Sequence, residues 1–270
     1  MKLKPEWYDA ISRRISRRRF DGRAVPAGLR EQLEMFCDGP DEPGAELAPA
    51  RVRLVDDPAQ TLFTGLVGGY GKVAGTPLAA AFVVRVPAGG DGVPEDAQAA
   101  AGYLGEAFIL EATRLELGTC WIAGTFDRNV ATGLVGLARG EQVIALTPLG
   151  YPTEQQSGGE RVVRTMVKAS ARLSVEKLAP GILDGGWPRW AVAAVHAARL
   201  APSGANRQPW RFRLDGDALV VSRAEKLYWT APMDLGIARL HVELGAMHEG
   251  VAGAWTQLPA PDVAAFTPAG

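Results

Sequence analysis

The chain has 270 residues, enough for one large domain or two related halves. Its 29 Lys and Arg balance 30 Asp and Glu, so the chain has no overall positive charge that would attract nucleic acid. Cys37 and Cys120 are too few for a disulfide scaffold or a multi-cysteine metal site. We expect a cytoplasmic protein without a membrane span, because the start lacks the apolar core of a signal peptide and no apolar run is long enough.

The first elements are predicted from hydrophobic periodicity. Residues 6–16 are expected to form a helix with a basic end, and residues 26–37 a second helix opened by Pro26. Residues 38–49 are rich in Gly and Pro and should form a loop. A short strand follows at 50–57, and the continuous apolar run at 78–86 predicts a buried strand.

The strongest helix signal spans Asp96–Leu117, where apolar residues recur at helical spacing and few charges interrupt them. We therefore expect a central helix buried on most sides, capped at its C-terminus by Gly118. Residues 142–152 predict another buried strand, followed by a polar loop at 153–160.

After Pro180 the pattern begins again. Residues 190–201 predict a helix, and residues 210–222 predict a hairpin around Asp215-Gly216. A further helix is expected at 234–250 with Asp234 as its N-cap, and the tail 259–270 is expected to be loose. This order resembles a shortened copy of the earlier elements. The predicted fold is α+β with two related halves, residues 1–180 and 181–270, in one compact unit.

The motif RRISRRRF holds the first candidate site residues. In an extended chain, Arg14, Ser16 and Arg18 would lie on one side, where guanidinium groups and a hydroxyl make a good phosphate clamp. A solvated basic helix face is the alternative interpretation of the same charge run.

The motif PSGANRQPW holds the second set. Ser203, Asn206 and Gln208 can each donate and accept hydrogen bonds, and Gly204 permits close approach of a ligand to the backbone. Such a loop suits the edge of a planar, amide-like ring. The alternative is an ordinary helix-to-strand connection in which Asn206 stabilises a turn.

A third motif, LGTCWIAGTF, could present backbone N–H groups beside Gly118 and Gly124, or could simply be a helix cap and a turn. The sequence lacks a phosphate-binding P-loop, a dinucleotide fingerprint, a metal-binding histidine pair and a nucleophile elbow. We therefore assign no catalytic side chain and no metal ligand. If the chain is an enzyme, a cofactor must supply the reactive chemistry.

Together these motifs, with TPLGYP at 147–152, resemble the FMN-dependent nitroreductase family along nearly the whole chain. The family pattern Arg-Arg-Ser-x-Arg-x-Phe appears here at 14–20, with Ile15 in place of the second arginine. The pattern Pro-Ser-Ser-x-Asn-x-Gln-Pro-Trp appears at 202–210, with Gly204 in place of the second serine.

The resemblance implies a role for each matching residue. Arg14, Ser16 and Arg18 would hold the FMN phosphate and ribityl chain, with Ile15 contributing its backbone. Arg172 would add a further phosphate-binding base. Lys72, in YGKVAGTP, would lie near flavin N1 and O2, where its charge stabilises the reduced ring. Ala123 and Gly124 would face flavin N5. The ring-binding loop would contribute Pro202, Ser203, Gly204, Asn206 and Gln208.

The spacing of the two main motifs also has an implication. Family members are homodimers in which the arginine clamp and the Pro-Ser loop of one FMN site come from different subunits. Here the clamp occurs only in the first half and the loop only in the second. The resemblance therefore implies a fused pseudo-dimer with one FMN site, for which a monomer is sufficient.

The implied function is an FMN-dependent oxidoreductase. NADH or NADPH would pass a hydride to flavin N5, and nitroaromatics or quinones would accept the electrons in ping-pong order. Trp121, Phe126 and Tyr70 are candidates for the apolar wall above the flavin, and core packing is the alternative for each. Two other functions stay open: a flavin-sequestering protein whose segment 151–172 covers the cofactor, and a structural protein that keeps the fold without flavin.

Overall fold

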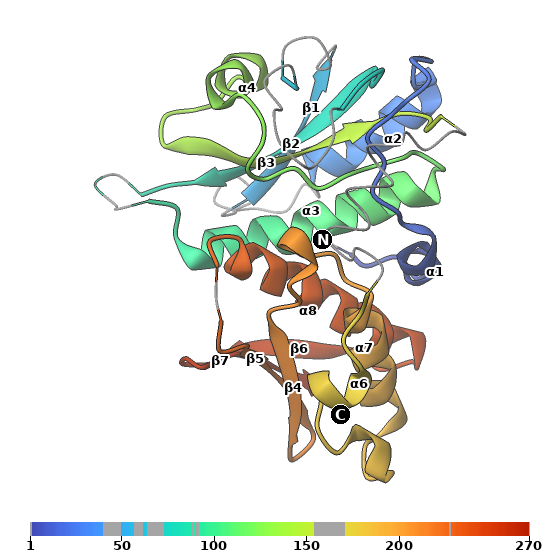
Figure 1. Cartoon of the computed structure of the whole chain (residues 1–270), viewed down its shortest axis with the longest axis vertical. Helices are drawn as coiled ribbons and strands as arrows, with labels where there is room; N and C mark the ends of the chain where they lie inside the picture. The colour runs from blue at the N-terminus through green and yellow to red at the C-terminus, as the bar shows by residue number, and fades with distance from the viewer. Residues whose placement is uncertain are drawn as a thin grey trace.

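The computed structural model describes residues 2–39, 50–56, 62–63, 73–87, 89, 92–153, 171–226 and 228–269. The helices found there are α1 (Glu6–Arg13), α2 (Ala27–Asp38), α3 (Glu95–Arg114), α4 (Arg128–Val135), α6 (Val175–Leu178), α7 (Arg189–Arg199) and α8 (Ala231–His248), with 3₁₀ turns η2 (Ile182–Asp184) and η3 (Gly204–Asn206). The strands are β1 (Ala50–Asp56), β2 (Leu78–Arg85), β3 (Glu141–Leu149), β4 (Trp210–Asp215), β5 (Ala218–Arg223), β6 (Gly253–Gln257) and β7 (Asp262–Pro268). Figure 1 shows two antiparallel sheets on opposite sides of the paired helices α3 and α8, which confirms the α+β class.

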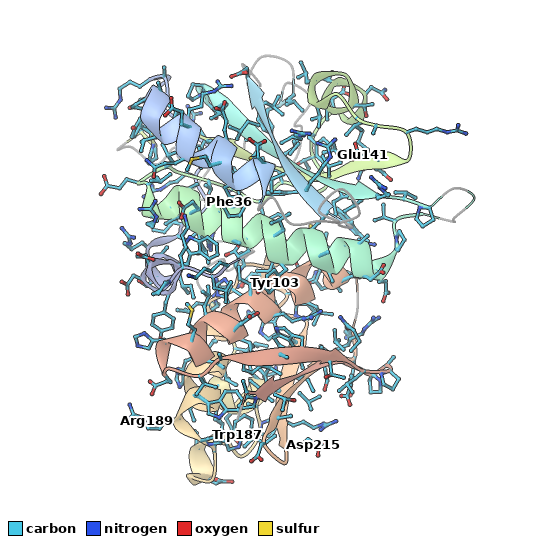
Figure 2. All side chains as sticks on the ribbon, turned by 180° about the vertical axis from the view of Figure 1, so that it is seen from behind. Phe36, Tyr103, Glu141, Trp187, Arg189 and Asp215 are labelled. Carbon is cyan, nitrogen blue, oxygen red and sulfur yellow. The ribbon has the colours of Figure 1, made fainter. Side chains whose placement is uncertain are left out.

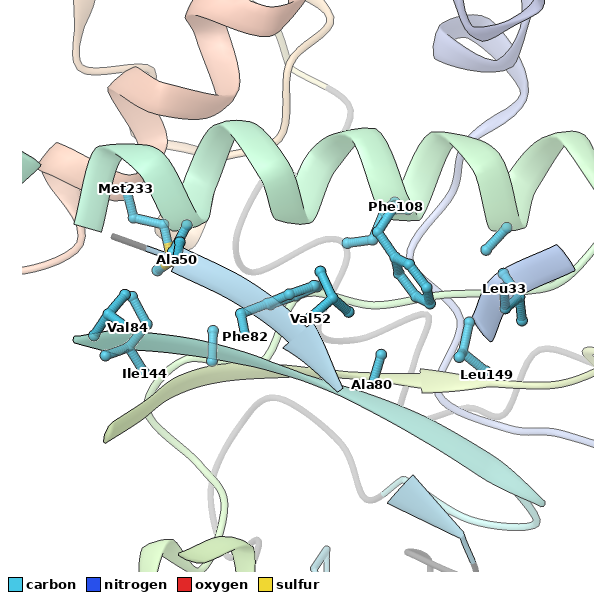
Figure 3. Close-up of a cluster of buried hydrophobic side chains, with 14 of the residues drawn as sticks. Leu33, Ala50, Val52, Ala80, Phe82, Val84, Phe108, Ile144, Leu149 and Met233 are labelled. Atoms are coloured by element: carbon cyan, nitrogen blue, oxygen red, sulfur yellow. The ribbon is translucent and has the colours of Figure 1, made fainter. Parts of the chain in front are cut away.

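The first sheet has the order β1-β2-β3. Its central strand β2 is buried at every position except Arg85, because both faces of the sheet are covered. Ala80, Phe82 and Val84 face α3, where Phe108 points onto the sheet (Figure 3). The residues between them pack against the side that α4 covers. The strand predicted at 78–86 is thus confirmed, and its two buried faces explain why its sequence does not alternate.

The second sheet has the order β4-β5-β7-β6. The hairpin predicted at Asp215-Gly216 joins β4 to β5, and Gly216 has the positive φ of +58° that this turn requires. The prediction of a loose tail at 259–270 is wrong. Strand β7 lies between β5 and β6, where Ala264 is buried and Phe266 packs in the second core. Its two strand partners, rather than a long apolar run, hold this segment in place.

Two helix ends differ from their predicted positions. Helix α1 ends at Arg13 rather than at residue 16, because the next residues form an extended segment. Helix α3 ends at Arg114, and Glu116 rather than Gly118 takes the left-handed conformation, with φ +63°. Gly118 instead pairs with Gly150 in a short antiparallel bridge.

The start of α8 also differs. The helix begins at Ala231, with Thr230 at its N-cap position, so Asp234 lies inside the helix and is not its cap. Pro232 is tolerated there because the first-turn amides of a helix have no partner within the helix. Asp234 is thereby freed for contacts with the neighbouring loop.

Helices α3 and α8 cross at two glycines. A Cβ atom on Gly102 would lie 2.0 Å from the Met233 carbonyl oxygen, and one on Gly236 would lie 1.9 Å from the Ala99 carbonyl oxygen. Only glycine at both positions lets the backbones approach this closely. Near the crossing, Tyr103 lies between the helices (Figure 2) and donates to a carboxylate on α8. No helix among the described residues is long and apolar enough to cross a membrane.

The two central helices end in the same way. The amide of Leu117 donates to the Ala112 carbonyl at 2.9 Å, and the amide of Val251 donates to the Ala246 carbonyl at 3.0 Å. In both cases the bond spans five residues, and the residue before the donor has a positive φ. This is the Schellman geometry, in which the last free carbonyls of a helix are satisfied by the turning chain.

The segments that follow the two helices also correspond. Residues 118–122 run antiparallel beside β3, with paired bonds between Ile122 and Leu146, just as β6 runs antiparallel beside β7. Trp121 and Trp255 occupy these segments, each nineteen residues after the crossing glycine of the preceding helix. Both sheets therefore have the same order of pairing around their helix.

Candidate functional site

The basic motif after α1 is extended. Residues 14–20 run between two neighbouring segments, with the Arg17 amide donating to the Thr119 carbonyl at 2.7 Å and the Phe20 amide donating to the Ala74 carbonyl at 3.0 Å. Side chains of an extended chain alternate between two sides. The solvated helix face is therefore not the arrangement that this motif adopts.

The alternation separates the motif into two sets. Arg14, Ser16 and Arg18 line one cavity, which confirms that they share a side. Ile15 and Arg17 line a separate depression on the other side. Ile15 is 41% exposed, so its substitution for the second arginine of the pattern leaves the cavity wall unchanged.

The cavity has a volume of about 470 Å³ and lies between segments that are distant in the sequence. Ten of the thirteen predicted site residues line it: Arg14, Ser16, Arg18, Ala123, Gly124, Arg172, Pro202, Ser203, Gly204 and Asn206. The other three are Ile15, Gln208, which is buried beside the cavity, and Lys72, which lies outside the described residues.

The loop after α7 has a strained backbone. Ala205, Asn206 and Gln208 have φ values of +49°, +55° and +51°, which side-chain-bearing residues rarely adopt. Such a conformation persists only where surrounding contacts fix it, and it is frequent at ligand clamps. Here the Gln208 amide donates to the Ser203 hydroxyl at 2.9 Å, and the Gly204 amide donates to the Asp234 carboxylate at 2.9 Å.

Gln208 supports this loop from behind. Its side-chain oxygen accepts from the Leu173 amide at 2.9 Å, and its side-chain nitrogen donates to the Ala171 carbonyl at 3.2 Å. The Asn206 side chain donates to the same Ala171 carbonyl at 2.6 Å. Both side-chain amides therefore hydrogen-bond the loop to residues 171–173. Gln208 supports the loop conformation and does not line the cavity.

Positive charge is concentrated at one end of the cavity. The Arg14 side chain is only 8% exposed, and its Nε has no hydrogen-bond partner among the described residues. Among the described residues, Arg172 donates only to neutral acceptors, Asn206 Oδ1 at 2.5 Å and the Leu200 carbonyl at 3.0 Å. Burial, and then the nearby charges of Arg14 and Arg199, lower the pKa of Arg172. This end of the cavity is suited to an anion.

A buried acid lies beneath this end. Glu106 on α3 accepts from Trp121 Nε1 at 2.7 Å and is 3.8 Å from Arg14 Nε. The oxygen that faces Arg14, Oε1, also lies 3.0 Å from His241 Nε2, whereas Trp121 donates to Oε2. Since His241 Nδ1 lies 3.0 Å from the Ala197 carbonyl, which can only accept, Nδ1 carries a proton. The network fixes Trp121 in the cavity wall.

The segment after α3 offers backbone donors. The amides of Ala123 and Gly124 form no hydrogen bond within the described parts of the chain, whereas the Ile122 amide is paired with β3. Both residues line the cavity. Unpaired amides beside a cavity are satisfied by water or by a ligand acceptor.

Asp234 joins α8 to the strained loop. Its Oδ2 accepts from the Gly204 amide, from Tyr228 at 2.8 Å and from Thr230 at 3.2 Å. Burial raises its pKa to about 7, partly offset by these donors and by the charge of Arg207. A Cβ atom on Gly204 would lie 2.4 Å from Thr230 Oγ1, so the glycine at this position of the pattern has a steric cause.

Sequence reasoning missed the aromatic side of the cavity. Tyr228, Trp229 and Asp234 all line it, on the turn before α8 and in its first turns. The segment 228–230 matches no motif, and no pattern in the sequence joins it to the distant loop. Phe126, predicted as a possible wall, packs instead in the core beneath α4 and against Arg128. Tyr70 and most of the predicted lid, residues 154–170, lie outside the described residues.

Comparisons with known proteins agree with this architecture. A family model described as "Putative TM nitroreductase" matches residues 86–246. A solved structure of a "putative nitroreductase" from Thermotoga maritima is 21% identical, covering 96% of this chain and 92% of that one, with a TM-score of 0.61. An FMN-dependent nitroreductase from Clostridium difficile is 17% identical, covering 55% of this chain and 88% of that one, with a TM-score of 0.41. No curated protein matches the chain.

Proposed function

The chain belongs to the family of the "Putative TM nitroreductase" model, and from that premise we propose that it is an FMN-dependent NAD(P)H oxidoreductase. The observation that carries the proposal is the buried Arg14 side chain, whose Nε has no hydrogen-bond partner among the described residues, beside Arg172, which hydrogen-bonds there to neutral acceptors. An anionic group would satisfy both. The same cavity is also lined by Trp121, Tyr228 and Trp229, so it suits a ligand that carries both an anionic group and a planar ring.

FMN has this shape, and the described residues suit each of its parts. Arg14, Ser16, Arg18 and Arg172 would hold the phosphate and ribityl chain through charged and hydroxyl donors. The loop at 202–206 would border the ring, with its backbone already fixed in the strained conformation. The free amides of Ala123 and Gly124 would donate toward flavin N5. Lys72 keeps the role that the resemblance implies, near flavin N1 and O2.

Bound FMN would supply the redox chemistry, taking a hydride from NADH or NADPH and then passing electrons to a nitroaromatic, quinone or similar acceptor. The chain's own residues would bind and orient the partners. Because one open cavity serves both, donor and acceptor would use it in turn, which is the ping-pong order. We assign no catalytic side chain.

We further propose that the chain is a fused pseudo-dimer, with halves 1–180 and 181–270. The reciprocal contacts of Gly102 and Gly236 support this. Each glycine faces a carbonyl on the other's helix, and such matching contacts are expected of a two-fold arrangement. The matching helix ends and the matching order of strand pairing support it as well. A two-fold arrangement within one chain makes a monomer sufficient.

One FMN per chain is expected, because the second half differs at the corresponding place. There the Leu258 amide donates to the Val263 carbonyl at 3.0 Å, so it is not open to a ligand as the Gly124 amide is. Arg239, three residues after the crossing glycine, lies over the Trp255 ring at 4.7 Å. In the first half that position is Gly105, and Trp121 packs directly on it.

The first test is the visible absorption spectrum of the purified protein, with flavin quantified after denaturation. We expect one FMN per chain, and oxidation of NADH or NADPH that depends on an added nitroaromatic or quinone. Arg14→Gln with Arg172→Gln should weaken FMN binding strongly while leaving the fold intact by circular dichroism. Arg189→Gln, an exposed arginine far from the cavity, is the matched control. A colourless protein that takes up no FMN would contradict the proposal. Bound FMN without turnover would contradict the oxidoreductase assignment and leave flavin binding standing.

A further inference from the structure

Trp229 is the one aromatic side chain among the large hydrophobic residues that are exposed in the described structure, with 62% of its surface accessible. It lies directly before α8 and lines the cavity. Its Cζ2 atom is 3.1 Å from the point where a Cβ atom on Gly124 would lie. One edge of the indole thus contacts the Gly124 backbone, while much of the ring remains in contact with solvent.

The turn that carries Trp229 is fixed by its neighbour. Tyr228 donates from its hydroxyl to Asp234 at 2.8 Å, and its carbonyl accepts from the Ala231 amide at 2.8 Å. The guanidinium of Arg207 lies over the Tyr228 ring at 4.5 Å. The backbone is therefore held in place, but the indole of Trp229 is not required for packing. A large apolar group left exposed at the rim of a cavity is typical of a binding surface.

Arg207 supplies a positive charge on this side of the cavity. Arg207 is exposed and forms no ion pair among the described residues. Asp234 is the single acidic residue among the described residues that line the cavity, and its Oδ2 already accepts three hydrogen bonds. The three other cavity arginines belong to the clamp that the proposed function assigns to phosphate. Arg207 thus lies over the ring of Tyr228, the residue before Trp229, and has no role in that clamp.

We propose that Trp229 and Arg207 form a subsite for the second substrate that selects planar aromatic acceptors carrying a carboxylate or a similar anion. The inference rests on the proposed function, because it assigns part of that same cavity to the electron acceptor. The indole face stacks on a planar ring. The guanidinium binds the anionic substituent through forked donors.

The test compares two acceptors of similar shape, 4-nitrobenzoate and 4-nitrobenzamide. In a ping-pong reaction, kcat/KM for the acceptor reports only the acceptor half of the reaction. We expect the wild type to favour the carboxylate by about tenfold, and Arg207→Gln to bring the ratio close to one. Trp229→Ala should lower kcat/KM for both acceptors about three- to tenfold, with Trp229→Phe retaining most of the activity. Leu183→Ala, an exposed residue on η2, and Arg189→Gln are the matched controls.

A binding measurement that needs no turnover separates the subsite from the chemistry. Benzoate and benzamide, which the enzyme cannot reduce, are titrated calorimetrically into the FMN-loaded protein. Tighter binding of benzoate, lost in Arg207→Gln and weakened in Trp229→Ala, supports the subsite. An active, FMN-loaded enzyme that shows no preference for the anion, or whose preference survives Arg207→Gln, overturns it. A protein that holds no FMN or oxidises no NAD(P)H instead contradicts the proposed function.

Discussion

Gly102 and Gly236 contact each other's helices reciprocally at the centre of the molecule. Each faces a carbonyl oxygen on the opposite helix, and that oxygen belongs to the residue three positions before the other glycine. The two close approaches set the spacing of α3 and α8, which in turn places the segment after α3 against the turn before α8. The cavity between these segments therefore depends on the crossing.

Alanine at either crossing glycine should destabilise the protein. Gly102→Ala or Gly236→Ala would force a Cβ atom to within about 2 Å of a backbone oxygen, so the helices must separate. We expect a loss of about 2–4 kcal/mol in the free energy of unfolding for each variant. Urea denaturation monitored by circular dichroism measures it. Gly133→Ala on α4 is the control, because a Cβ atom there meets nothing within 4 Å and alanine favours a helix.

The variant with alanine at both Gly102 and Gly236 tests whether the two glycines set the same distance between α3 and α8. Once the helices have separated for the first alanine, the second should cost less. The combined loss should therefore be smaller than the sum of the single losses by at least about 1 kcal/mol. Additive losses would show that the two contacts are independent and would contradict a shared crossing.

Serine at Gly204 should distort the loop at 202–208, although serine is the residue of the family pattern there. Its Cβ atom would lie 2.4 Å from Thr230 Oγ1. The clash displaces the Gly204 amide from Asp234, so we expect Gly204→Ser to weaken FMN binding about tenfold or more and to lower the melting temperature by several degrees. Equilibrium titration of FMN into the flavin-free protein gives the affinity.

A second substitution should restore the loop in that variant. Thr230→Ala removes the Oγ1 atom that the serine meets, so Gly204→Ser with Thr230→Ala should bind FMN more tightly than Gly204→Ser alone. Thr230→Ala by itself removes one donor to Asp234 and should have a small effect. Equal FMN affinity in Gly204→Ser and in the double variant would show that the clash with Thr230 is not the reason for glycine at this position.

Asp234 should make the stability fall as the pH rises from about 4 to 7. Burial raises its pKa to about 7, above the value near 4 of an unfolded chain. The folded state then binds a proton that the unfolded state releases in this range, so the contribution is complete below pH 4 and is lost as the pH passes 7. Between pH 5 and 8 the loss should be about 2–3 kcal/mol.

Comparison with Asp234→Asn isolates this effect. The variant keeps a side-chain oxygen for the Gly204 amide but cannot titrate. The free energy of unfolding is measured in urea at pH 5, 6, 7 and 8. The variant lacks the pH-dependent contribution of the Asp234 carboxyl, so the stability difference between wild type and variant should shrink or reverse as the pH rises. A difference that stays constant across this range would mean that Asp234 is ionised throughout.

The sequence was sufficient for the parts of the site that depend on local geometry. Arg14, Ser16 and Arg18 share a side because an extended chain alternates, which the spacing alone predicts once the segment is extended. The loop at 202–208 was recognisable from its small and amide residues. The buried strand β2 could be predicted because an apolar run of that length is typical of a strand covered on both faces.

Other parts depend on partners that are distant in the sequence. Asp234 resembles a helix cap, and only the approach of Gly204 from another element reveals its role. Strand β7 contains only a short apolar run, VAAF, and is ordered because β5 and β6 supply its hydrogen bonds. Trp229 lines the cavity because the turn before α8 lies against Gly124, in the segment after α3. No local pattern contains these contacts.

Glu111 should stabilise the attachment of the N-terminal segment, and with it the position of the clamp. Its buried carboxylate accepts from Lys4 at 2.9 Å, from Trp7 Nε1 at 2.7 Å and from Arg114. Burial alone would raise the pKa of Glu111, but these donors together lower it to about 2. A depressed pKa contributes stability above the unfolded value near 4.5, and this contribution is lost as the pH falls toward 2.

Glu111→Gln should therefore cost about 2–3 kcal/mol in the free energy of unfolding at pH 7 and progressively less toward pH 3. Because α1 leads directly into Arg14, the variant should also bind FMN more weakly at pH 7. Glu34→Gln, which removes the exposed partner of Arg30 on α2, is the control and should change stability by less than about 0.5 kcal/mol. Urea denaturation of all three proteins at pH 3, 5 and 7 provides the comparison. A loss in Glu111→Gln that is as large at pH 3 as at pH 7 would show that packing, rather than the carboxylate's charge, fixes α1 to α3.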